Sequence, residues 1–174
     1  YHRHVTCCSS TPDGSLFVAG FNDGTIRVYR MPGHRLVREY KGHKKAVTTC
    51  TVSPDGSRLA TASWDGTTKI WRLPKGEIIR TIDTHAGGIA ALAGPGDRSL
   101  IAAVTGDGIT RTYNGKDGSL VSSSKSQGTS QRCCTFSPDN SSLIPGGWDG
   151  KVRSSTIPRG SLKQTPPGHP RIVS

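Results

Sequence analysis

The sequence is poor in the residues that build large apolar cores. Of its 174 residues, 32% are hydrophobic and 6% aromatic, with only one Met, three Phe and three Trp. No apolar run approaches the ~18–20 residues that a membrane-spanning helix needs, so we expect no such helix. Glycine (22 residues) and proline (11 residues) are frequent instead. This balance favours many short strands joined by tight turns over long helices.

The sequence also lacks the cysteine spacing of a disulfide framework or a zinc site. Its cysteine count of five is odd, and no Cys-x-x-Cys occurs among them. We therefore expect reduced thiols that are buried as small apolar side chains. Reduced thiols in turn predict an intracellular compartment, either cytoplasm or nucleus. The cysteines are Cys7, Cys8, Cys50, Cys133 and Cys134.

Acidic residues are scarce relative to basic ones. The chain has 23 Lys and Arg against 12 Asp and Glu, which gives a formal net charge of +11. Such a charge suits an acidic partner, whether nucleic acid, anionic lipid or an acidic protein face. The cations are scattered, however, and their longest run is Lys44-Lys45. A solvated basic surface without a dedicated ligand is the alternative interpretation.

The sequence offers little material for catalysis. Most acidic residues fall in turns, and His2 and His4 at the spacing i, i+2 are too few to hold a metal. The glycines of "TGDG" and "NGKDG" read as hairpin turns, because no helix pattern follows them as in a phosphate-binding loop. We expect no catalytic residue, no metal and no cofactor.

What the chain does have is a repeat. Three independent series of residues recur in steps of 42, a spacing that chance does not explain. The first series consists of four aspartates that each precede glycine, as in "SWDG" and "GWDG". The series are Asp23, Asp65, Asp107 and Asp149; Asp13, Asp55, Asp97 and Asp139; and His43, His85, Gln127 and His169. They divide the chain into repeats of approximately 1–42, 43–84, 85–126 and 127–168, with 169–174 as the start of a further repeat or a tail.

Each repeat divides into four strand-like pieces. In the second repeat these are "VTTCTVS", "SRLATAS", "TTKIWRL" and "EIIRTI", joined by "PDG", "WDG" and "PKG". Asp-Gly and Pro-Lys-Gly supply the backbone angles of tight hairpins, and pieces this short are typical of strands. We therefore predict an all-β protein made of four-stranded antiparallel meanders, which must stack on one another to bury their faces.

The segment "GHKKAVTTCTVSPDGSRLATASWDGTTKIWRL" resembles a WD repeat of the β-propeller family, and this register covers essentially the whole chain. The resemblance implies a hydrogen-bonded network of His43, Thr61, Asp65 and Trp71. The other repeats depart from it: the corresponding residues are Tyr1, Ala19, Asp23 and Tyr29; His85, Ala103, Asp107 and Tyr113; and Gln127, Pro145, Asp149 and Ser155.

The resemblance also implies a function. In the family, the loops between repeats lie at the same end as the turns that contain Asp23, Asp65, Asp107 and Asp149, and this end often binds partners. This predicts a non-catalytic scaffold that docks proteins, some with an acidic face, within a larger complex. An RNA- or ribonucleoprotein-associated propeller is the alternative. The expected binding rim consists of Asn22, Trp64, Trp148, Arg3, Lys44 and Lys45.

Rings of this family usually have seven or eight blades, so four repeats are expected to be part of a larger ring. The remaining blades could come from a longer protein, from another chain, or from a second copy that completes eight. A compact four-bladed closure is the last alternative. The absence of an initiator Met and of a signal-peptide pattern in "YHRHVTCC" agrees with an excised piece or a different true N-terminus.

Overall fold

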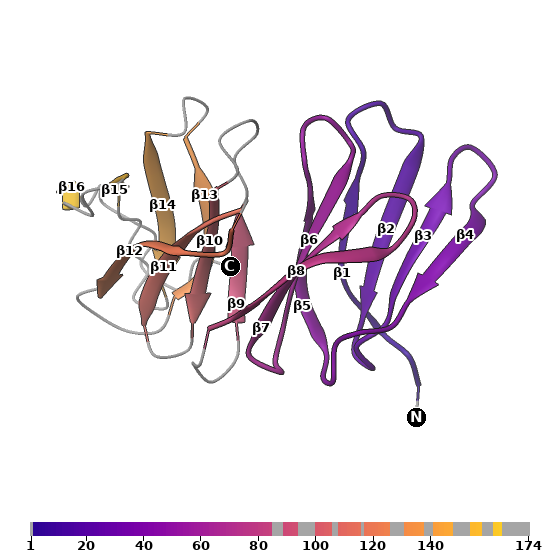
Figure 1. Cartoon of the computed structure of the whole chain (residues 1–174), viewed down its shortest axis with the longest axis horizontal. Coiled ribbons are helices and arrows are strands. Elements are labelled where there is room, and N and C mark those ends of the chain that lie inside the picture. The colour runs from indigo at the N-terminus through magenta and orange to yellow at the C-terminus, as the bar shows by residue number, and fades with distance from the viewer. Residues whose placement is uncertain are drawn as a thin grey trace. The chain divides into compact units, whose positions relative to one another are not determined.

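The computed structural model describes most of the chain, and every regular element in this part is a β-strand. The strands form four antiparallel sheets of four, each built from strands that are consecutive in the sequence (Figure 1). This confirms the predicted fold class. The described residues are 2–84, 89–93, 100–105, 108–115, 117–125, 131–137, 141–147, 154–157 and 162–164.

The strands follow the predicted Val-, Ile- and Thr-rich pieces. The first sheet contains β1 (Val5–Ser10), β2 (Leu16–Phe21), β3 (Ile26–Arg30) and β4 (Arg35–Tyr40). The second contains β5 (Val47–Val52), β6 (Arg58–Ser63), β7 (Thr67–Arg72) and β8 (Glu77–Asp83). The third contains β9 (Ile89–Ala93), β10 (Leu100–Thr105), β11 (Ile109–Asn114) and β12 (Leu120–Lys125). The fourth contains β13 (Gln131–Phe136), β14 (Ser142–Gly147), β15 (Ser154–Thr156) and β16 (Leu162–Gln164).

The sheets share their irregularities as well as their strand order. In all four, the last strand carries one extra residue opposite the third strand, at positions 37, 79, 121 and 163. A second bulge near the start of the first strand recurs in the first, second and fourth sheets. A bulge bends and twists a strand at a defined point. Bulges in the same register therefore show that the sheets are equivalent structures.

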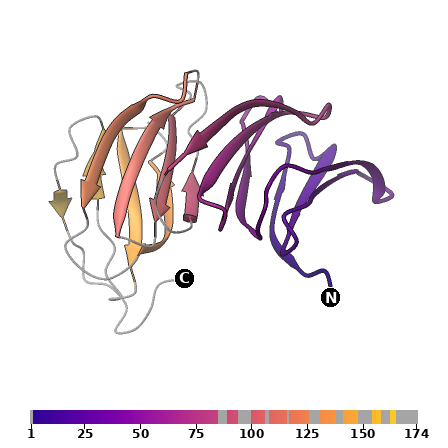
Figure 2. The same cartoon turned by 60° about the horizontal axis from the view of Figure 1, so that its bottom comes forward.

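By their internal contacts the described residues group into two compact units, Tyr1–Ile89 and Ala90–Ser174. In the N-terminal unit, the first two sheets stack face to face around one apolar core (Figure 2). Tyr40 of the first sheet stacks on Trp71 of the second, with ring centroids 5.4 Å apart. The other buried residues of this core are Val18, Ile26, Val28, Val47, Cys50, Leu59 and Leu73.

The C-terminal unit has its own buried residues, which lie on β10, β11 and β14. The hydrophobic ones among them are Ile101, Ala102, Ala103, Val104, Tyr113 and Leu143, and Thr110 and Thr112 are buried as well. β10 also contacts β13, which brings the third and fourth sheets together. No helix in the described part of the chain has the length and apolar character that crossing a membrane requires.

The five cysteines are free thiols, but their burial differs from the sequence-based expectation. Cys50 is buried, Cys7, Cys133 and Cys134 are half-buried, and Cys8 is exposed. Cys7 packs against the core between the first two sheets. Because successive strand residues point to opposite faces, Cys8 points away from that core. The prediction of a buried thiol is therefore wrong for Cys8.

The N-terminal unit has two ends of different construction. At one end, which we term the loop end, the chain entering each sheet meets the turn between its second and third strands. Backbone hydrogen bonds from Asn22 to His4 (3.1 Å) and from Trp64 to Ala46 (3.1 Å) make this connection. At the opposite end, termed the turn end, the first and third hairpin turns of each sheet meet. There Met31 N–H donates to the carbonyl oxygen of Ser15 at 2.8 Å.

Candidate functional site

Asp65 joins the turn between β6 and β7 to the loop that enters the second sheet. Its Oδ1 accepts hydrogen bonds from the backbone N–H of Thr67 at 2.9 Å and from the Thr67 hydroxyl at 2.7 Å. Its Oδ2 accepts from the backbone N–H of Lys44 at 2.8 Å and lies 3.0 Å from His43 Nδ1. Both oxygens are occupied, so this carboxylate fixes the turn and the loop together.

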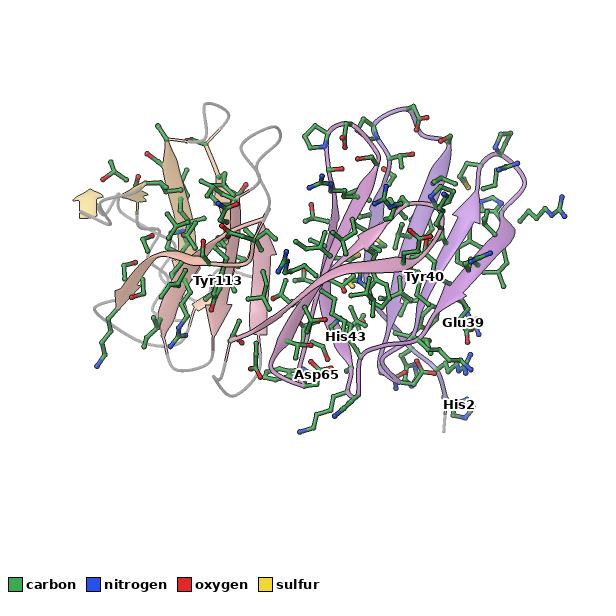
Figure 3. All side chains as sticks on the ribbon, in the orientation of Figure 1. His2, Glu39, Tyr40, His43, Asp65 and Tyr113 are labelled. Atoms are coloured by element: carbon green, nitrogen blue, oxygen red, sulfur yellow. The ribbon has the colours of Figure 1, made fainter. Side chains whose placement is uncertain are left out.

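A hydrogen-bonded chain runs inward from this carboxylate. His43 Nε2 lies 2.8 Å from Thr61 Oγ1, which accepts a hydrogen bond from Trp71 Nε1 at 2.8 Å. Asp65 can only accept, so His43 Nδ1 carries the proton and Nε2 is the acceptor in the neutral ring. The Thr61 hydroxyl therefore donates to Nε2 while it accepts from the indole. Figure 3 labels His43 and Asp65 at the loop end of the second sheet.

The ionisation of the pair matches these roles. Burial lowers the pKa of His43, and the hydrogen bond to Asp65 offsets this only in part, so the imidazole stays neutral. Burial alone would raise the pKa of Asp65, but hydrogen bonds from Thr67, the Lys44 backbone and His43 bring that pKa down to about 2. The pair is thus a neutral imidazole and a carboxylate at neutral pH.

The first sheet fastens its loop with ion pairs instead. Arg3 Nε lies 2.7 Å from Asp23 Oδ2, and Arg3 Nη1 lies 3.5 Å from Glu39 Oε2. The same Glu39 oxygen accepts from Arg27 Nε at 2.8 Å. Asp23 also accepts from the backbone and hydroxyl of Thr25. The sequence did not predict this role of Arg3. The only signal was that the first repeat, which contains Arg3, has Tyr1 where the second repeat has His43.

The remaining networks are incomplete or lie outside the described residues. In the first sheet, Ala19 and Tyr29 occupy the places of Thr61 and Trp71. In the third sheet, Ala103 and Tyr113 are buried at the corresponding places. The turn aspartates Asp107 and Asp149 lie outside the described residues, and so do His85 and Gln127.

The six residues of the expected binding rim have different surroundings. Asn22 is engaged locally: its Oδ1 accepts from the backbone N–H of His4 at 2.9 Å, and its Nδ2 donates to the carbonyl oxygen of His2 at 3.3 Å. The Arg3 guanidinium is held by two carboxylates. Trp148 lies outside the described residues. All five described rim residues are exposed, but Asn22 and Arg3 have the side-chain partners named above. We call the other three, Trp64, Lys44 and Lys45, the Trp64 corner.

The backbone beneath the Trp64 corner is fixed. Trp64 N–H donates to the Ala46 carbonyl at 3.1 Å, and Ser63 Oγ donates to the Lys45 carbonyl at 2.9 Å. The Trp64 side chain is nonetheless 49% exposed. Among the described residues, neither the Lys44 nor the Lys45 ammonium lies within ion-pair distance of a carboxylate. The corner therefore combines an accessible indole with two cations on a rigid support.

The buried imidazole is not placed for catalysis. A His–Asp pair resembles the base and its orienting group in some enzymes, but such a base must reach an external substrate. The side chain of His43 is 0% exposed, and both of its nitrogens are bonded within the fold. His43 and Asp65 therefore serve the architecture of the loop end.

Comparison with known proteins agrees with this architecture. The family model described as "WD domain, G-beta repeat" matches residues 1–30 and 34–72, which form most of the first two sheets. No curated protein matches the chain significantly. The matched segments contain the whole network of the second sheet, including the indole of Trp71 and the turn aspartate. Residues 1–30 and 34–72 therefore match the WD-repeat family, which supports the resemblance seen in the sequence.

Proposed function

We propose that this chain is a non-catalytic WD-repeat scaffold that docks a protein partner at the Trp64 corner. WD repeats generally mediate protein–protein interactions and scaffolding, and proteins that contain them are typically non-catalytic. Fold alone does not define a partner, so the proposal has to rest on a particular surface. The observation that carries it is the exposed Trp64 side chain on a turn that is hydrogen-bonded to the loop with Lys44 and Lys45.

The chemistry of the corner suits an acidic peptide segment. Tryptophan is enriched among residues that dominate binding energies, because a large rigid surface is buried at little entropic cost. Trp64 and Leu36 are equally exposed at 49%, but only Trp64 lies beside two cations without carboxylate partners in the described structure. Lys44 and Lys45 would attract Asp or Glu side chains and speed encounter. The net charge of +11 acts in the same direction.

The loop end also meets the mechanical requirement for docking. The loop residues His43 and Lys45 are held from two sides: by the turn of their own sheet, and by Gly24 of the first sheet. A Cβ atom at Gly24 would lie 2.6 Å from the His43 carbonyl oxygen and 2.9 Å from that of Lys45. A surface that is already ordered loses little conformational entropy when a partner binds. Pre-organisation therefore favours this end as the docking surface.

An RNA-associated function is the second candidate, because the net charge of +11 is what phosphate binding needs. The two functions differ in their dependence on salt. Phosphate contacts release counterions, so RNA affinity falls steeply between about 50 and 200 mM salt. An interface anchored by a buried indole loses much less over that range.

The test is a selection from displayed peptides that are rich in Asp and Glu and contain one apolar anchor. Peptides bound by the full chain are then titrated against Trp64→Ala, the double variant Lys44→Ala/Lys45→Ala, and the matched control Leu36→Ala. We expect Trp64→Ala to cost about 2 kcal/mol of binding free energy. The double variant should weaken binding mainly at low salt, and Leu36→Ala should bind normally. Undiminished binding by Trp64→Ala would refute the docking site.

The cellular setting is proposed on chemical grounds. The five free thiols support an intracellular location.

We also propose that each 42-residue repeat is one blade, and that further blades complete a ring. These could come from additional sequence, another chain or a second copy. The mass of the assembled species in solution, measured by light scattering, distinguishes self-association from a requirement for another chain.

A further inference from the structure

At the turn end of the first sheet, the turn between β3 and β4 places two arginines directly opposite each other on neighbouring strands. Arg30 and Arg35 are direct partners in the β3–β4 ladder, and both are exposed. Like charges directly opposite one another in a sheet are destabilising. Among the described residues, neither guanidinium lies within ion-pair distance of a carboxylate.

The other sheets show that the fold does not require this arrangement. The corresponding pair in the second sheet is Arg72 and Glu77, whose side chains form an ion pair at 3.2 Å. In the third sheet the corresponding residues are Asn114 and Ser119, which carry no charge. The first sheet is therefore exceptional among the three in placing two like charges at this position.

The same turn contains a residue with an unfavourable backbone conformation. His34 has a φ of 53°, and it is the one non-glycine residue with a positive φ in the described chain. The corresponding residues are Gly76 (φ 77°) and Gly118 (φ 75°), and glycine adopts this left-handed conformation without the penalty of a side chain. The first sheet thus accepts strain at the residue next to Arg35, and the side chain it gains is an imidazole.

Two polar groups near this turn, Arg38 and Asp13, already have partners elsewhere. Arg38 Nη1 donates to the carbonyl oxygen of Lys75 at 3.0 Å, which holds the β7–β8 turn against β4. The nearby Asp13 carboxylate is occupied by its own turn, where it accepts from the Thr11 hydroxyl at 2.6 Å and from the Ser15 backbone at 3.0 Å.

We propose that Arg30, His34 and Arg35 form a site for the phosphate group of a phosphorylated serine or threonine in a partner protein. A phosphate monoester offers three acceptor oxygens and a charge near −2, and paired arginines are its preferred ligands. Bound between the arginines, it relieves the repulsion that the empty turn carries. The cations gather around one turn and form no extended track, so the site fits a single phosphate better than a nucleic-acid backbone.

The site is tested by NMR titration of the full chain with a short Gly/Ala-rich peptide that carries one phosphoserine. We expect saturable shifts at residues 30–38, and none with the serine form of the peptide. Inorganic phosphate and single-stranded RNA are separate arms of the titration. Equal binding of both peptides would overturn the proposal. So would binding of inorganic phosphate as tight as that of the phosphopeptide, or tighter binding of RNA at the same residues.

The repeat itself supplies matched variants. Arg35→Glu copies the ion pair of the second sheet, so the chain should stay folded while its affinity for the phosphopeptide falls about tenfold or more. His34→Gly restores the glycine of the other turns and should raise the melting temperature while binding weakens. Glu77→Arg should create a second site at residues 72–77.

Unchanged affinity in Arg35→Glu, with its fold confirmed by circular dichroism, would refute the site. Trp64→Ala should bind the phosphopeptide normally, which separates this site from the proposed docking corner.

Discussion

At the scale of single residues, the buried hydroxyl of Thr61 is the link on which the second sheet depends. It accepts from the Trp71 indole and donates to His43, and both hydrogen bonds are 2.8 Å long. Thr61 is 0% exposed. Buried polar groups stabilise a core when all are paired and cost free energy when one is left alone.

Thr61→Val keeps the shape of the side chain but removes both hydrogen bonds. It should lower the free energy of unfolding by about 1–3 kcal/mol for each group left unpaired, the indole N–H and the imidazole nitrogen. Denaturant titration of the full chain measures this change. Thr81→Val is the control, because Thr81 is exposed on β8 and should shift stability by no more than about 0.5 kcal/mol. Equal effects of the two substitutions would contradict the assigned role of Thr61.

His43 should make stability depend on pH in the weakly acidic range. Because burial lowers the pKa of His43 in the folded state, the unfolded chain binds more protons as pH falls through the ordinary value of about 6.5. The stability that neutral His43 contributes is therefore complete above about pH 6.5 and declines below it. We expect the unfolding midpoint to fall between about pH 7.5 and pH 5.5, and to fall less in His43→Gln. The same slope in both proteins would show that another group titrates.

Residues of the loop end differ in how far they could be predicted. The resemblance singled out His43, Thr61, Asp65 and Trp71, because the second repeat carries all four residues of the family's network at the family's spacing. It could not predict that Arg3 binds Asp23 and Glu39, since no rule of spacing says which long side chain reaches a carboxylate. Arg3 was placed on the binding rim because it is a cation in a loop that enters a repeat.

At the scale of elements, the strands could be predicted and their irregularities could not. Short runs of Val, Ile and Thr between Asp-Gly and Pro-Lys-Gly turns identify the strands in the second sheet. The bulges at positions 37, 79 and 121 add one residue to the last strand without any change of composition. Val37, Ile79 and Val121 read like ordinary strand residues, so only coordinates reveal that each is unpaired in the ladder.

The first two sheets should depend on each other through Gly24. Its φ of 85° already disfavours a side chain, and a Cβ there would press on the carbonyl oxygens of the loop entering the second sheet. Gly24→Ala should therefore cost more than the ~1–2 kcal/mol of a left-handed alanine alone, and should loosen His43–Ala46 in hydrogen exchange. Gly14→Ala is the matched control, because Gly14 has a φ of 69° but no atom within 4 Å of the added Cβ. Similar costs for both substitutions would contradict this coupling.

At the scale of the whole molecule, the cations behind the net charge of +11 differ in whether a carboxylate lies beside them. Arg3 and Arg27 are neutralised by carboxylates at the loop end. Lys44 and Lys45 keep their charge beside Trp64, and Arg30 and Arg35 keep theirs at the turn end. Composition predicted an acidic partner, but it could not say which cations stay available. The availability of each cation depends on contacts such as that of Arg3 with Glu39, two residues that are far apart in the sequence.

The central claim is that the rigid Trp64 corner, and no reactive group, is what this protein uses to bind its partner. The most direct measurement is fluorine NMR of the full chain with its three tryptophans replaced by 5-fluorotryptophan. Each resonance is assigned with a Trp→Phe variant. When an acidic peptide from the selection is added, the Trp64 resonance should shift and saturate with binding, while that of buried Trp71 stays in place. A peptide that binds without moving the Trp64 resonance would contradict the account.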